Sequence, residues 1–237
     1  MMQVQEVKDT KEEKGETEKR ILIVTFPGFG YLQDRPLFYF AKKLAVQLGC
    51  DVLDIVYREI SGEGSVRERA EKSLAGAVRD AGEQIGQALR DAERQGKKYG
   101  HIFCISKSFG TLVAGSVWEE LQASRPVTQM FLTPLPETYT MYARGKACIM
   151  ASGTADPFMT EEGLRLMEAD EKVEFMVFPG ANHSLENPED TCESVRNLER
   201  IVMRYEEAMN SICAIFNKHQ QGEIYFGVGS DGNICNK

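Results

Sequence analysis

The sequence predicts an α/β protein with a doubly wound, mostly parallel sheet of six strands and helices on both faces. Apolar runs of strand length alternate with amphipathic stretches of helical length from residue 20 to residue 218. This alternation is typical of parallel sheets that are built from strand–helix–strand units. Apolar residues make up 42% of the 237-residue chain, which is enough for a substantial core.

The first two strands and the helix between them are bounded by turn residues. The apolar run 20–26 ends at Pro27, and Pro36 then opens a helix that Gly49 closes. Proline suits the first helical position because its fixed backbone angle is already helical and its missing N–H would have no partner there. The run 51–57 is the second expected strand.

A Gly-rich linker at 61–64 leads into the longest amphipathic stretch, a helix expected over 65–95. Its apolar side repeats with a period near 3.6 residues. That side carries Val66, Ala70, Leu74, Ala77, Ala81, Ile85, Ala88 and Ala92. The apolar run 101–105 is the third expected strand, and a helix over 109–123 follows it.

The second half of the chain continues the alternation. Strands are expected over 127–132, 146–151 and 173–178, with a short helix over 160–169 before the last of them. A long helix over 189–218 ends the pattern. Its apolar side carries Val195, Leu198, Ile201, Val202, Tyr205, Met209, Ile212 and Ile215.

One domain over 20–218 accounts for this pattern. Residues 1–19 are mostly charged and contain no apolar segment, which predicts a disordered lead-in without an export signal. The tail 219–237 has a different character, because 223–228 is strand-like and 230–233 is a turn signal. A small β-hairpin is therefore expected in the tail.

Charge and cysteine content narrow the classes of function. A net charge of -8 without a basic stripe argues against a nucleic-acid partner. No segment has the roughly 18 uninterrupted apolar residues that a membrane span needs. The six cysteines are scattered and form no Cys-x-x-Cys pair, so neither a metal site nor a disulfide framework is indicated. We expect a cytoplasmic protein that acts on a small molecule without a cofactor.

The most informative motif lies where the third strand meets the next helix. Ser108 stands at the apex of a sharp turn between Ser106 and Gly110, which fits the spacing Gly-x-Ser-x-Gly with serine in place of the first glycine. Small residues at these two positions let the helix cross close to the strand. The turn presents the hydroxyl and aims the helix N-terminus at the same point, so the motif predicts acyl transfer with Ser108 as the nucleophile.

Two further strand ends supply partners for this serine. Asp156 follows the fifth strand and His183 follows the sixth, and ligands of open parallel sheets bind beyond these carboxyl ends. His183 is the expected base, because His101 begins a strand at the opposite edge and His219 lies beyond the last helix. Asp156 is the expected acid, and Glu137, in the loop after the fourth strand, is the alternative.

The oxyanion of the tetrahedral intermediate needs hydrogen-bond donors. By position, these are the backbone N–H groups of Phe109, next to the nucleophile, and of Phe29, in the loop after the first strand. Gly28 and Gly30 flank Phe29 and allow the backbone to approach closely.

These motifs resemble the α/β-hydrolase superfamily, in particular its small, lidless bacterial members of the dienelactone-hydrolase and carboxylesterase kind. The resemblance covers residues 21–218. Its most specific segments are Ser-Lys-Ser-Phe-Gly at 106–110, Gly-Thr-Ala-Asp-Pro at 153–157 and Gly-Ala-Asn-His-Ser-Leu-Glu at 180–186.

The resemblance implies a compact sheet in the order 2-1-3-4-5-6 and no cofactor. It also implies the roles of nucleophile, general base, orienting acid and oxyanion donors for Ser108, His183, Asp156, and Phe29 with Phe109, respectively. Pro27 stands where many members have histidine, and Ser106 replaces a glycine. Neither departure removes a reacting group.

The segment 133–145 is too short for a helical cap domain, so the pocket is expected to be shallow and open. The expected substrate is therefore a small carboxylic ester or thioester, hydrolysed through an acyl-enzyme. The expected lining consists of Gly28, Phe29, Gly30, Tyr31, Leu135, Tyr139, Tyr142 and Phe158.

Two other functions are compatible with these features. The fold can serve as a binding module whose triad is unused. Gly28-x-Gly30 also matches part of a dinucleotide fingerprint, and Asp54 lies about twenty residues further on. Gln33 stands where the third glycine of that fingerprint would be, which argues against nucleotide binding.

Overall fold

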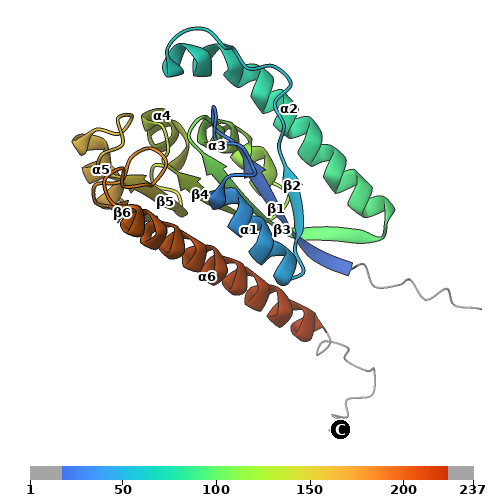
Figure 1. The fold of residues 1–237 in the computed structure, drawn as a ribbon. Coiled ribbons are helices and arrows are strands. Elements are labelled where there is room, and N and C mark those ends of the chain that lie inside the picture. Colours follow the sequence, from blue (N-terminus) through green and yellow to red (C-terminus); the bar gives the residue numbers. More distant parts are fainter. Residues whose placement is uncertain (1–17, 224–237) are drawn as a thin grey trace, which may run out of the picture.

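The computed structural model describes residues 18–223 and shows one six-stranded, all-parallel sheet (Figure 1). The sheet order is β2-β1-β3-β4-β5-β6, which confirms the expected order. The strands are β1 (Glu18–Phe26), β2 (Asp51–Asp54), β3 (Lys97–Lys107), β4 (Val127–Leu132), β5 (Cys148–Gly153) and β6 (Val173–Phe178).

Helices cover both faces of this sheet (Figure 1). Helices α1 and α6 pack together on one face, and α2 and α3 pack together on the other, so the sheet is doubly wound as predicted. The helices are α1 (Pro36–Gln47), α2 (Val66–Arg94), α3 (Phe109–Gln122), α4 (Pro136–Thr138), the π-helix η1 (Tyr139–Ala143), α5 (Glu161–Glu168) and α6 (Thr191–Glu223).

Alternate side chains of the central strand β3 enter two separate hydrophobic cores. Ile102 and Cys104 face the layer of α2 and α3, whereas Phe103 and Ile105 face the layer of α1 and α6. Successive strand residues point to opposite faces, so a strand that is covered on both sides must be apolar throughout. This requirement explains the uninterrupted apolar run in the sequence.

Helix α2 agrees closely with the helix expected from the sequence. Its N-terminus is fixed by a capping box, in which the Ser65 hydroxyl accepts from the Glu68 N–H and the Glu68 carboxylate accepts from the Ser65 N–H. Small side chains, among them Ala77 and Ala81, are fully buried on its inner side. These alanines allow α2 to lie close against α3.

Strand β2 is shorter than expected. It ends at Asp54 because side chains take over the backbone groups that follow. The carbonyl of Ile55 accepts from the Gln33 amide (2.6 Å), and the N–H of Val56 donates to the Gln84 amide oxygen (3.0 Å). These bonds lead the chain away from the sheet and toward α2.

Strand β3 and helix α6 are longer than expected. The first residues of β3, from Lys97, pair with the first residues of β1, and α6 continues to Glu223. Residues 1–17 and almost all of the hairpin expected in the tail lie outside the described residues. Within residues 18–223, no helix combines the length and the apolar character that a bilayer span requires.

Candidate active site

Ser108 lies between β3 and α3 in a backbone conformation that few side chains adopt. Its φ is 53° and its ψ is -123°. Its N–H donates to the carbonyl of Leu132 at the end of β4 (3.0 Å), and its carbonyl accepts from the Thr111 N–H (2.9 Å). These two bonds hold a strained turn, and such strain is concentrated at functional sites.

Two glycines let the loop after β1 lie directly against this turn. A Cβ atom on Gly28 would stand 2.9 Å from the Cβ of Ser108, and one on Gly110 would stand 2.2 Å from the carbonyl oxygen of Phe26. Ser106 is tolerated at the first position of the motif, because its buried hydroxyl has a hydrogen-bond partner, a backbone carbonyl of β4 (3.3 Å).

Gly110→Ala is expected to lower the free energy of unfolding by about 3 kcal/mol or more, because the new methyl group meets backbone oxygens of β1 and its loop. Gly82→Ala is the matched control, since Gly82 is exposed on α2 with open space around it. That change is expected to stabilise the protein by about 0.5–1 kcal/mol. Urea unfolding measures the free energy of unfolding of both variants. Small changes of the same sign in the two variants would contradict the packing described.

Two hydrogen bonds join the three residues expected to form a triad. The Oγ of Ser108 lies 2.8 Å from Nε2 of His183, and Nδ1 of His183 lies 2.8 Å from Oδ2 of Asp156. The other carboxylate oxygen of Asp156 accepts from the Phe158 N–H (2.9 Å), and the Asp156 side chain is fully buried. An ionised carboxylate can only accept, so it favours a proton on Nδ1 and leaves Nε2 free to accept one.

Glu137, the alternative acid, lies elsewhere. Its carboxylate is 3.9 Å from the guanidinium of Arg67 on α2, and its side chain is 40% exposed. The short helix α4 carries Glu137 toward α2 and solvent. The structure therefore brings Asp156, and not Glu137, to His183.

The loops that carry the acid and the histidine are packed against each other. The N–H of Ala155 donates to the carbonyl of Ala181 (3.0 Å), and a Cβ on Gly153 would stand 2.0 Å from the same oxygen. The side-chain oxygen of Asn182 accepts from the Ser184 N–H (2.7 Å), which closes the histidine loop. These contacts fix the distance between the two loops.

Lys107, the residue before the nucleophile, is buried beside the triad and was not anticipated from the sequence. It is 1% exposed, and its Nζ donates to the Thr133 hydroxyl (2.6 Å) and to the backbone carbonyl of His183 (2.5 Å). It therefore ties the end of β3 to the loops after β4 and β6. The available signal was a lysine that directly continues a buried apolar run, because lysine is almost never fully buried without partners.

Burial lowers the pKa of Lys107 from 10.5 to about 7, and the carboxylates of Asp156 and Glu186 partly oppose this effect. The ring of Tyr31 also faces the Lys107 amine, 4.9 Å from Nζ. The amine consequently titrates near neutral pH while it is held against the histidine loop.

The stability of the wild type relative to Lys107→Met is expected to rise between pH 7 and pH 10. The unfolded lysine keeps its proton up to about pH 10.4, whereas folded Lys107 loses it above about 7. The unfolded state thus binds more protons in this window, so the difference in free energy of unfolding increases by up to about 1.4 kcal/mol per pH unit. Urea unfolding of both proteins measures it, and a difference that does not change with pH would contradict the assignment.

The expected oxyanion donors adjoin the nucleophile. The rings of Phe29 and Phe109 stack with 4.3 Å between their centroids, and the guanidinium of Arg69 lies 4.5 Å from the Phe29 ring centroid. Phe29 follows Gly28, which lies against Ser108. The Phe109 N–H is in the first turn of α3, where N–H groups have no intrahelical partner and the helix dipole is positive.

The expected pocket residues have different surroundings. Leu135 and Phe158 line a cavity of about 500 Å³. Tyr31 lies apart from this cavity, and its hydroxyl accepts from the Leu37 N–H (3.2 Å). Burial raises the pKa of Tyr31 to about 12. Gly30 shapes the turn before Tyr31 with a φ of 75°.

Two tyrosines of the expected lining do not line this cavity. The Tyr139 hydroxyl donates to the carbonyl of Leu166 on α5 (3.1 Å). The Tyr142 ring packs on Gly115 of α3, and its hydroxyl accepts from Ser116 (2.9 Å). The π-helix η1 turns these two side chains toward α5 and α3 and away from the cavity, and the sequence did not predict this helix.

Comparison with known proteins relates this fold to solved structures. No family model and no curated protein matches the chain. A protein of unknown function from Agrobacterium tumefaciens, described provisionally as an α/β hydrolase, matches with a TM-score of 0.58 at 18% identity over 85% of this chain and 88% of its own. An α/β serine hydrolase homologue from Coxiella burnetii matches with a TM-score of 0.53 at 18% identity over 81% and 87%.

A bacterial heroin esterase also matches, with a TM-score of 0.54 at 19% identity over 84% of this chain and 77% of its own. At identities below 20%, these three matches concern the fold alone, and they agree with the sheet order described above. The chain therefore has the fold of the α/β-hydrolase superfamily.

Proposed function

We propose that the protein is a serine hydrolase that cleaves carboxylic esters or thioesters through an acyl-enzyme. The observation that carries the proposal is the pair of 2.8 Å hydrogen bonds from Ser108 through His183 to Asp156. The three residues follow three different strands, so only the folded chain brings them together. A hydroxyl on a strained turn, an oriented imidazole and a buried carboxylate are the groups that nucleophilic acyl transfer requires.

In this mechanism the Oγ of Ser108 attacks the carbonyl carbon while its proton passes to Nε2 of His183. Asp156 stabilises the resulting imidazolium, since its carboxylate already accepts from Nδ1. The N–H groups of Phe29 and Phe109 stabilise the oxyanion. His183 returns the proton to the leaving alcohol or thiol. A water molecule, deprotonated by the same nitrogen, then attacks the acyl-enzyme. The bond between the acyl carbon and Oγ of Ser108 breaks, His183 returns the proton to Oγ, and the acid is released.

The names of similar structures favour an ester as the substrate. One of the structures reported above is called an esterase and another a serine hydrolase homologue. The proposal transfers only the general chemistry, hydrolysis of an ester or thioester by an activated serine.

Nucleotide binding is less compatible with the geometry. Gly28 packs against Ser108 and the backbone of Lys107, so it faces the serine turn and not a phosphate. The carboxylate of Asp54, which would have to bind a ribose, is engaged by Lys42 (2.7 Å) and Thr25 (2.5 Å). A binding module with an unused triad would not need the complete and aligned hydrogen-bond chain that is present.

A hydrolysis screen over p-nitrophenyl esters and acyl thioesters tests the proposal. We expect saturable release of p-nitrophenol or thiol, and we expect one equivalent of a fluorophosphonate to abolish it. No turnover of any ester or thioester would contradict the proposal. Turnover that survives the fluorophosphonate would contradict the role of the serine.

A further inference from the structure

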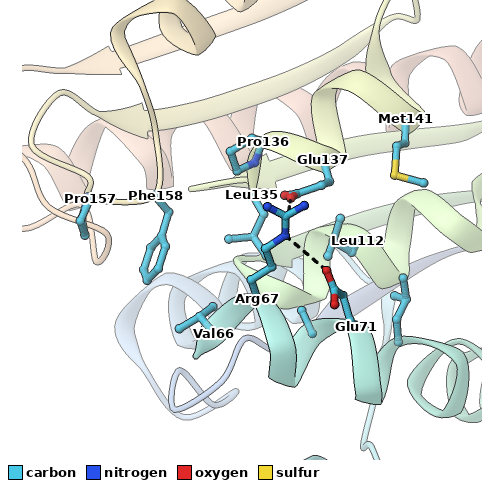
Figure 2. A pocket seen from close by; sticks show the side chains of 12 residues that line it. Val66, Arg67, Glu71, Leu112, Leu135, Pro136, Glu137, Met141, Pro157 and Phe158 are labelled. Carbon is cyan, nitrogen blue, oxygen red and sulfur yellow. Dashed lines mark hydrogen bonds and ion pairs between the residues drawn. The ribbon is translucent and has the colours of Figure 1, made fainter. Parts of the chain in front are cut away.

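A cavity of about 500 Å³, here called the α2 slot, lies between the first turns of α2 and the segment of α4 and η1 (Figure 2). Its apolar wall includes Ala70 and Leu74 of α2, Leu112 of α3, Leu135 before α4, Met141 of η1, and Phe158 after β5. Cavities of about 300–1,000 Å³ with mostly apolar walls are typical of small-molecule sites. An acetyl group would leave most of this volume unfilled, which revises the expectation of a shallow pocket.

One end of the α2 slot adjoins the proposed triad. The Phe158 ring lies edge-on to the His183 ring, with 4.6 Å between centroids, and the Phe158 N–H donates to Asp156. Leu112 stands one turn after Ser108 on α3, on the side that faces the slot. Phe158 and Leu112, two residues of the slot wall, therefore lie next to triad residues. A substrate whose carbonyl is at Ser108 can extend its chain into the slot from this end.

Three charged side chains at the slot are joined by ion pairs. Arg67 of α2 lies between the carboxylates of Glu71 (3.3 Å) and Glu137 (3.9 Å), as Figure 2 shows. All three side chains are at least 40% exposed, so these pairs add little stability. One cation between two carboxylates leaves an excess of negative charge, which disfavours an anionic substrate group and tolerates an uncharged one.

The length of the slot sets the length of chain that it can hold. The slot runs along α2 from Val66 to Leu74, which corresponds to about 12 Å at the helical rise per residue. Met141, whose side chain is largely exposed, lies at the side of the slot away from Phe158 (Figure 2). A longer chain would therefore extend toward solvent.

An extended alkyl chain advances about 1.3 Å per carbon, because its C–C bonds of about 1.5 Å zigzag, so this length holds about eight to ten carbons. We propose that the α2 slot binds an uncharged, linear apolar chain of the substrate of about this length. This inference rests on the proposed ester hydrolysis and specifies its substrate class: medium-chain esters or thioesters. The chain can belong to the acyl group or to the alcohol, because the first is bonded directly to the carbonyl carbon that Ser108 attacks and the second is joined to it through the ester oxygen.

Two ester series test the proposal. In p-nitrophenyl esters from acetate to dodecanoate, or in alkyl acetates from methyl to decyl, we expect kcat/KM to peak near eight to ten carbons, about 30-fold or more above the shortest member. A peak in the first series assigns the slot to the acyl group, and a peak in the second assigns it to the alcohol. No dependence on chain length in either series would overturn the proposal.

Variants that fill the slot test its location. Ala70→Phe and Leu74→Trp are each expected to lower the octanoate-to-acetate ratio of kcat/KM by about tenfold or more. Leu74 is only half-buried, so Leu74→Trp keeps the test valid if Ala70→Phe does not fold. Ala75→Phe is the matched control, because Ala75 is exposed on the side of α2 away from the slot. If Ala70→Phe and Leu74→Trp gave the same octanoate-to-acetate ratio of kcat/KM as Ala75→Phe, the assignment would be overturned.

A binding experiment separates the slot from the catalytic proposal. We expect octanamide, a neutral analogue, to bind to Ser108→Ala in calorimetry, and we expect Leu74→Trp in the same background to abolish binding. If octanamide binds in this way but no ester is hydrolysed, the proposed function is wrong and the slot stands. If esters are hydrolysed without chain-length preference and octanamide does not bind, the slot is wrong and the proposed function stands.

Discussion

Replacing Ser108 with alanine is expected to lower kcat for ester hydrolysis by about 10⁴-fold or more. The hydroxyl is the only group of this residue that contacts Nε2 of His183 (2.8 Å), so its removal leaves no nucleophile at this point. Ser108 is 6% exposed and alanine fits its place, so we expect an unchanged unfolding curve. Steady-state kinetics with the best p-nitrophenyl ester, together with urea unfolding, measures both quantities.

Ser211→Ala is the matched control for this variant. Ser211 is exposed on α6, and its hydroxyl bonds only to the helix backbone at Glu207. We expect its kcat to stay within about twofold of the wild type, as is usual for surface changes. Wild-type turnover by Ser108→Ala would rule out this serine as the nucleophile.

Asp156→Asn is expected to lower kcat by about 10³- to 10⁴-fold, with a small change in KM. The N–H of Phe158 donates to Oδ1 of Asp156, so the amide oxygen of asparagine must stay at that position. The NH₂ group then faces Nδ1 of His183 and donates to it, which forces the ring proton onto Nε2. A protonated Nε2 can no longer accept the proton of Ser108. The loss thus reports the tautomer of the base.

Steady-state kinetics at several pH values checks this prediction, with Asp91→Asn as the control. Asp91 is partly exposed in the last turn of α2, which leads into the start of β3, whereas the proposed site lies beyond the ends of the strands. A normal kcat for Asp156→Asn would contradict the orienting role of the carboxylate. A loss of similar size for Glu137→Gln but not for Asp156→Asn would assign that role to the alternative acid.

Strand-end placement is the part of the site that could be predicted from the sequence. Each buried strand was visible as an apolar run, and parallel strands end at one edge of the sheet. A serine, an aspartate and a histidine that follow three such runs therefore had to lie near one another. The structure brings Ser108, Asp156 and His183 within hydrogen-bond distance, and it confirms the strand order and the two helical layers.

Contacts between side chains of distant elements could not be predicted in this way. The α2 slot depends on how the first turns of α2 lie relative to α4, which no local pattern encodes. The pairing of Lys107 with the His183 carbonyl depends on the path of a loop far along the chain. The π-helix η1 reorients Tyr139 and Tyr142, and its single wide turn leaves no distinct spacing in five residues.

Covalent labelling with a fluorophosphonate tests the central claim most directly, because it detects an activated serine without knowledge of the substrate. Mass spectrometry of digested protein is expected to locate one adduct, on Ser108. We expect His183→Ala to lower the labelling rate by at least about 10³-fold, because the hydroxyl loses the base that lies 2.8 Å away. An adduct on another serine, or labelling of Ser108 at the same rate without His183, would contradict the account.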